Sequence, residues 1–176
     1  AMTFSIQASN PRFSENFDED DETLDEALET VFPLNAEAAV LNWSGAFALL
    51  SYKYDLSCIV SDVMMMLQQI LSMSSGKLRI AWPSNTFAAT WNLAWDSSNV
   101  TIDAQWASVV GSSVEDLNNV GALEIPRAEF LAEWKQLLRV AASGLEKCGY
   151  NEQNLPAMKE LREVISKIPK HGSLYE

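Results

Sequence analysis

Carboxylates are the most abundant groups in this chain that could do chemistry, and many of them lie in one stretch. Residues 14–29 read SENFDEDDETLDEALE, without a single Lys or Arg. Carboxylates this dense suit three uses: a metal or acid–base site of a hydrolase, a solvated surface that keeps the protein soluble, or a docking surface for a basic partner. The acidic residues of the stretch are Glu15, Asp18, Glu19, Asp20, Asp21, Glu22, Asp25, Glu26 and Glu29.

Other catalytic groups are scarce. The single histidine, His171, lies close to the C-terminus, where a catalytic or metal-binding role is not expected. Without a second histidine the chain cannot assemble an ordinary zinc site, and a Cys–His or Ser–His–Asp site would depend on His171. No Gly-rich phosphate loop is present. We therefore expect a protein that is not an enzyme and has no catalytic residue, metal, cofactor or small-molecule ligand.

Length and composition predict one globular domain over residues 1–176. The chain is 48% apolar and contains six Trp, enough for an aromatic-rich core. Cys58 and Cys148 each fall in an apolar helical pattern, which predicts two buried thiols rather than a disulfide. No apolar run approaches the ~18 residues of a membrane-spanning helix. Ala1 precedes Met2 and no signal peptide follows, so we interpret Ala1 as a cloning remnant and expect a cytosolic protein.

Hydrophobic periodicity predicts an N-terminal half that mixes strands and helices. The alternation over 3–8 predicts a strand, and the apolar face of 22–32 predicts an amphipathic helix. Residues 38–54 read as a hairpin or one long bent strand. The pattern of 56–73 predicts a core helix, with Asp55 as its N-cap and Gly76 just past its end. We expect 14–21 and 169–176 to be mobile.

The following residues predict three strands joined by turns, and then two helices. The strands alternate from Leu78, Phe87 and Val100, with Trp side chains on the apolar side. The sequence WNLAW could stack on a ligand, but Trp91 and Trp95 share a face with other apolar residues, which favours the core. Residues 111–121 predict a long polar loop.

The C-terminal part completes the expected fold. A short strand over 123–125 precedes a helix over 127–147, which Gly149 ends, and a last helix covers 155–168. The whole pattern predicts an α+β fold, with an antiparallel sheet that contains a three-stranded Trp-rich meander, packed by a central helix and a long C-terminal helix pair.

The net charge of −12 is unevenly distributed. Residues 1–126 hold four basic and seventeen acidic residues, a balance of −13, and residues 127–176 hold eight basic and seven acidic residues, a balance of +1. Direct nucleic-acid binding requires clustered Lys and Arg and is not expected. A dense negative field instead speeds association with a basic protein.

The segment ALEIPRAEFLAEWKQLLRVAASGLEKCGY, residues 122–150, follows the Trp-bearing strands. It resembles the closing strand and long helix of small acidic bacterial immunity proteins from contact-dependent growth inhibition and related polymorphic toxin systems. With the meander, the resemblance covers roughly a third of the chain. It implies a cytosolic, non-catalytic protein that binds a toxin domain and blocks its active site. The matching positions are Glu124, Ile125, Phe130, Leu131, Glu133, Trp134, Leu137 and Leu138.

The favoured hypothesis is an immunity protein that occludes a cognate toxin, with a basic nuclease as the expected target. The alternatives are a secretion-system chaperone or adaptor that binds a partner protein through Met and Leu faces, and a hydrolase that uses carboxylates alone. The resemblance does not supply contact residues, so electrostatics alone selects the partner-binding candidates: Asp18, Glu19, Asp20, Asp21, Glu22, Asp25 and Glu26, with Glu115 and Asp116 of the polar loop as secondary candidates.

Overall fold

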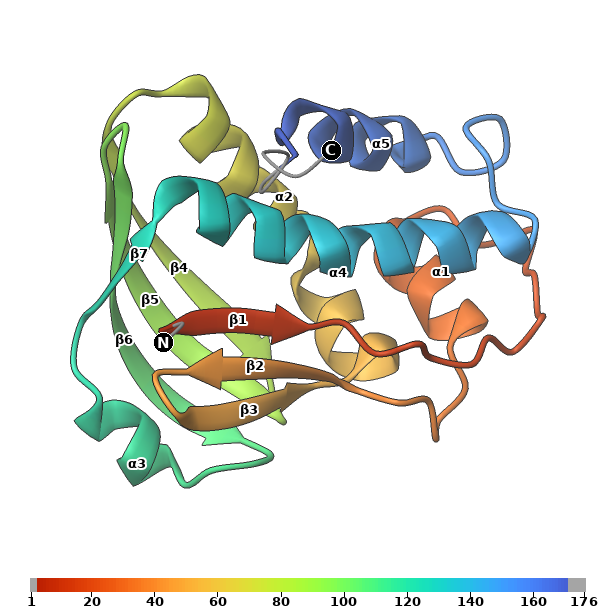
Figure 1. Ribbon diagram of the computed structural model, residues 1–176. Coiled ribbons are helices and arrows are strands. Elements are labelled where there is room, and N and C mark those ends of the chain that lie inside the picture. The colour runs from red at the N-terminus through yellow and green to blue at the C-terminus, as the bar shows by residue number, and fades with distance from the viewer. Residues whose placement is uncertain (1–2, 171–176) are drawn as a thin grey trace.

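The computed structural model describes residues 3–170 and confirms the α+β class (Figure 1). Two antiparallel sheets, of three and four strands, pack with helices around one buried core. Ala1, which we interpreted as a cloning remnant, and the single histidine, His171, lie outside the described residues. So do residues 171–176 of the segment 169–176 that we expected to be mobile. No helix of residues 3–170 combines the length and apolar character needed to cross a membrane.

The first sheet has the order β1-β2-β3 and confirms the hairpin alternative for residues 38–54. The backbone of Ser44 and Gly45 has φ values of 49° and 93°, the left-handed conformation that a tight two-residue hairpin turn requires. The strands are β1 (Phe4–Gln7), β2 (Ala39–Trp43) and β3 (Ala46–Leu50).

The second sheet contains the predicted meander and adds the predicted short strand as its fourth member. Its order is β4-β5-β6-β7, with every neighbouring pair antiparallel. Gly76 is the first residue of β4, where an added Cβ would lie 2.5 Å from the Trp95 ring. The strands are β4 (Gly76–Ser84), β5 (Phe87–Trp95), β6 (Asn99–Val109) and β7 (Leu123–Pro126).

The end of β6 continues onto the free edge of the first sheet. Ala48 of β3 pairs with Gly111, and the Leu49 N–H donates to the Val110 carbonyl at 2.7 Å. Gly111 has φ +134°, and a Cβ there would lie 2.6 Å from the Phe47 carbonyl oxygen, so only glycine allows this close approach. The chain then forms α3 (Val114–Asn119). The prediction of a long loop over 111–121 was therefore wrong, because Ser113 caps a short helix within it.

All six Trp side chains are buried, which confirms the core interpretation of WNLAW. Trp43 of the first sheet lies 5.1 Å from Trp91 and 5.2 Å from Trp106 of the second, measured between ring centroids. Trp82 meets Trp91 edge to face at 5.2 Å. Within residues 3–170, five buried indole N–H groups have no hydrogen-bond acceptor. They belong to Trp43, Trp82, Trp91, Trp106 and Trp134.

The helix α2 (Ser57–Ser72) continues directly from a π-helical turn, η1 (Tyr52–Leu56). The prediction of Asp55 as N-cap was wrong, because Ser51 caps the turn by accepting from the N–H groups of Tyr54 and Asp55. The buried Asp55 carboxylate accepts from the Ser51 N–H at 2.8 Å and from the Ser84 and Thr86 hydroxyls. Asp55 therefore ties the start of α2 to the β4–β5 turn.

The long helix α4 (Arg127–Lys147) crosses the molecule between β1 and α5 (Ala157–Lys167) (Figure 1). The remaining helix, α1 (Leu24–Val31), packs against α2 and α4. Cys148, at the end of α4, is buried as predicted. The prediction for Cys58 was wrong: it is exposed on α2, because the buried stripe of that helix passes through its neighbours Ser57 and Ile59.

Candidate partner-binding surface

The acidic stretch is built around the N-terminus of α1. Thr23 is the N-cap and accepts from the Glu26 N–H at 3.3 Å. The Glu26 carboxylate accepts in return from the Thr23 hydroxyl at 2.9 Å and from the Glu22 N–H at 3.3 Å. This is a capping box, and it places Asp25 and Glu26 in the first turn, where the helix dipole favours negative charge.

A buried tyrosine anchors the residues that precede α1. Tyr150, which follows the C-terminal end of α4, donates its hydroxyl hydrogen to Asp21 Oδ2 at 2.5 Å and accepts from the Asp18 N–H at 3.1 Å. Thr30 donates to the same Asp21 oxygen at 2.7 Å. The Phe17 ring lies 4.7 Å from the Tyr150 ring, between centroids. These contacts hold the acidic stretch against the body of the protein.

Asp21 thus differs from the other predicted contact residues. It is 9% exposed, and its carboxylate is occupied by Tyr150 and Thr30. Its position indicates a structural role. The other acidic residues of the stretch are exposed, and together they form what we call the acidic surface: Glu15, Asp18, Glu19, Asp20, Glu22, Asp25, Glu26 and Glu29.

Several of these carboxylates are available for a partner. Asp18 accepts from the Asp20 N–H at 2.9 Å, and Glu26 belongs to the capping box. Across residues 3–170 the ion pairs are Arg12–Glu37, Arg162–Glu146 and Arg162–Glu152, and none includes the acidic surface. Six members of the surface have neither an ion pair nor a side-chain hydrogen bond in the described part of the chain: Glu15, Glu19, Asp20, Glu22, Asp25 and Glu29.

The cation at α1, Lys53, binds backbone carbonyl groups and not the carboxylates of the acidic surface. Lys53 donates from Nζ to the Glu29 carbonyl and, at 3.2 Å, to the Phe32 carbonyl. These are the carbonyl groups at the end of α1, where the helix dipole favours positive charge. The acidic surface at the other end of the helix therefore keeps its negative field.

The secondary candidates do not share this surface. Glu115 and Asp116 are exposed in the first turn of α3, which packs beside β6 and β3. In Figure 1, α3 and α1 lie at opposite ends of the molecule. A contact through Glu115 or Asp116 would thus be a separate contact from one through the acidic surface.

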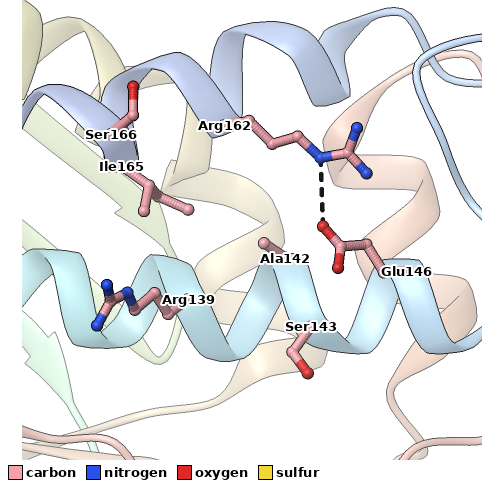
Figure 2. Close-up of a pocket in the computed structure, with 7 residues that line it drawn as sticks. All are labelled: Arg139, Ala142, Ser143, Glu146, Arg162, Ile165 and Ser166. Atoms are coloured by element: carbon pink, nitrogen blue, oxygen red, sulfur yellow. Dashed lines mark hydrogen bonds and ion pairs between the residues drawn. The ribbon is translucent and has the colours of Figure 1, made fainter.

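A pocket of about 270 Å³ opens between α4 and α5 (Figure 2). Its only carboxylate, Glu146, accepts from Arg162 Nε at 3.2 Å. Figure 2 shows the guanidinium groups of Arg139 and Arg162 at opposite ends of the pocket, so they do not converge on one anion. This pocket is not the deep acidic cleft that a carboxylate-only hydrolase requires. Within residues 3–170, no group of three His, Cys, Asp or Glu side chains could hold a metal ion.

The environment of Tyr150 changes its acidity. Burial, followed by the hydrogen bond to Asp21, raises the pKa of the Tyr150 hydroxyl. The hydroxyl therefore stays protonated and keeps donating to Asp21. Tyr150 and Phe17 were not among the predicted site residues, because their pairing joins positions 133 residues apart and leaves no local pattern. The run of acidic residues with no cation was the only sequence signal for this site.

Comparison of the chain with protein-family models, with curated proteins and with solved structures finds no match.

Proposed function

We propose that this protein is an immunity protein that binds a basic toxin domain and occludes its active site. The observation that carries the proposal is the acidic surface, whose carboxylates are exposed, unpaired with cations and anchored through Tyr150. The likeness of residues 122–150 to the strand and helix of immunity proteins adds to it. A basic nuclease is the expected target, because an array of carboxylates can replace the phosphates of its substrate.

Anchoring supports binding because it lowers the entropic cost of association. A segment that orders only in a complex loses conformational freedom at that moment, and affinity falls. Asp21 and Tyr150 hold the acidic stretch before any partner arrives. Asp18, Glu19, Asp20, Glu22, Asp25 and Glu26 are the proposed contact residues, and Asp21 is proposed to position them.

The decisive experiment is growth rescue. The C-terminal part of the protein encoded immediately upstream in the native locus is expressed in cells with and without this protein. The proposal expects that the fragment kills and that this protein restores growth. A harmless fragment, or one that kills in both strains, would remove the main support for the immunity function.

An adaptor for a partner protein is the second candidate, and two exposed apolar residues favour it. Phe47 and Val110 are 44% and 48% exposed at the edge of the first sheet. An adaptor would expose enough apolar surface to bind a hydrophobic dye strongly in the purified state. Weak dye binding together with growth rescue would leave the immunity function as the better account.

A further inference from the structure

The outer face of the first sheet carries a row of apolar side chains. Leu49 of β3 lies opposite Val40 of β2, and Val110 lies on the other side of Leu49 because its carbonyl accepts from the Leu49 N–H. Phe47 is two residues from Leu49 and so faces the same way. Val40 and Leu49 are half-buried, and Phe47 and Val110 are exposed. We call these four residues the sheet-face patch.

Polar side chains surround the patch. Gln7 lies opposite Val40, and Asn42 lies opposite Phe47. On the other side, the Ser112 hydroxyl accepts from the Phe47 N–H at 3.0 Å. An apolar centre with a polar rim is the usual anatomy of a protein–protein contact.

Two carboxylates lie beside the patch. The exposed Glu115 and Asp116 lie on α3, next to β3. Neither residues 38–52 nor residues 80–126 contain a Lys or Arg. A segment that covers this face with cations next to α3 would therefore be attracted by Glu115 and Asp116.

The acidic margin is held in a fixed place. Leu117 of α3 is buried, and Asn118 both donates to the Trp106 carbonyl at 3.0 Å and accepts from the Trp106 N–H at 2.7 Å. Gly111 brings the chain close enough to β3 to set Val110 beside Leu49. The patch and the acids are thus parts of one preformed surface.

We propose that the sheet-face patch binds a segment of a partner protein in which apolar side chains are flanked by Lys or Arg. The apolar side chains cover Phe47 and Val110, and the cations face Glu115 and Asp116. This inference does not rest on the proposed immunity function, and it concerns the end of the molecule away from the acidic surface.

A random 12-residue peptide library displayed on phage tests the proposal with the full-length protein as bait. Selection is run in parallel on the wild type and on the double variant Phe47→Ser/Val110→Thr. We expect a class of peptides that combines apolar residues with Lys or Arg and is enriched only on the wild type. Peptides drawn to the acidic surface are enriched on both proteins and are set aside.

Binding of synthetic peptides from this class then separates the contribution of the apolar side chains from that of the two carboxylates. The double variant is expected to weaken binding about tenfold, since truncating exposed anchors at the centre of a contact removes a large share of its energy. Glu115→Gln/Asp116→Asn is expected to weaken it about threefold and to reduce its salt dependence. Leu34→Ser is the matched control, because Leu34 is 77% exposed and lies outside the patch. Thermal unfolding of each variant checks that the fold is retained.

Three outcomes would overturn the proposal. The first is the absence of any peptide class that distinguishes the wild type from the double variant. The second is a distinguishing class without Lys or Arg. The third is self-association of the wild type in sedimentation velocity that the double variant abolishes, because a second copy of the chain would then be the occupant.

Discussion

The acidic surface includes carboxylates in the first turn of the capped helix α1, and the sheet-face patch lies beside carboxylates in the first turn of the capped helix α3, yet the two regions are built differently. At α1 the carboxylates belong to a segment that the buried Tyr150 holds in place, and Phe17 is the exposed large apolar residue beside them. At α3 only two acids are present, and they border Phe47, Leu49 and Val110. Charge therefore dominates one region and apolar area the other.

The two regions would contribute differently to the binding of a partner. A dense field acts over about 8–10 Å at ordinary salt and mainly raises the rate of encounter. Apolar side chains act only on contact and mainly slow dissociation. A partner that uses the first region should be sensitive to salt, and one that uses the second should be sensitive to truncation of Phe47.

Gly111, which holds the chain close to the sheet-face patch, is the position where a substitution should destabilise the fold most. Gly111→Ala should lower the free energy of unfolding by about 3 kcal/mol, because the added Cβ would both meet the Phe47 carbonyl and strain a backbone at φ +134°. Urea unfolding measures it. Gly121→Ala is the control, since Gly121 has φ +78° and nothing within 4 Å of an added Cβ. Equal losses for the two variants would contradict the role given to the close approach.

The carboxylates of the acidic surface should control the rate at which a basic partner binds. Replacing Glu19, Asp20, Glu22 and Asp25 with their amides should slow association with a basic toxin about tenfold or more at low salt, and the loss should shrink as salt rises. Stopped-flow kinetics with the toxin from the rescue experiment measures it. The control changes the same number of charges elsewhere, at positions without a side-chain partner in residues 3–170: Asp62, Asp103, Glu124 and Glu163. Equal slowing by both variants would assign the effect to net charge alone.

A smaller effect is expected from loosening the anchor of the acidic surface. Tyr150→Phe removes the hydroxyl that links Asp21 to the Asp18 N–H and should cost about 1–1.5 kcal/mol of stability. Amide hydrogen exchange should speed up in residues 15–23 more than in β5. Tyr54→Phe is the control, because Tyr54 is 47% exposed, and its change should stay within about 0.5 kcal/mol.

The smallest effect is a pH dependence in the alkaline range. The pKa of Tyr150 is raised in the fold by burial and by Asp21, so the folded state keeps this proton longer than the unfolded chain does. The resulting stability is fully present below about pH 10, the unfolded value, and is lost as pH rises through the higher folded pKa. Burial also raises the pKa of Tyr52, so the test is the difference between wild type and Tyr150→Phe. Parallel stability curves above pH 10 would refute the assignment.

Most of the secondary structure could be predicted from the sequence, because the strongest signals are local. The apolar stripe of α4 and the alternation of β5 each repeat over many residues, and both elements appear where the pattern put them. The prediction for the start of α2 was wrong because the Asp55 carboxylate accepts from the hydroxyl of Ser84 on β4, and Ser51 provides the cap. The preference for Asp at helix N-termini is a local signal and carries no information about a hydrogen-bond partner that is distant in the sequence.

The division into two sheets and the contacts that anchor the acidic surface could not be predicted from the sequence. Alternation shows that a segment is a strand but does not name its neighbour, so the pairing of Gly111 with Ala48 had no local sign. The acids were visible as a run. The burial of Asp21 could not be predicted in the same way, because it depends on Tyr150, 129 residues away. Selecting contact residues by charge alone therefore included one that the fold uses internally.

The cluster of Trp side chains makes the protein its own optical probe. Trp43, Trp91 and Trp106 lie within 6 Å of one another, between ring centroids, in the buried core. Their emission should be shifted to the blue, and their coupled transitions should give a paired signal in the ultraviolet circular dichroism spectrum. Because the acidic surface and the sheet-face patch contain no Trp, this signal should report on the packing of the two sheets and stay nearly constant when a partner binds.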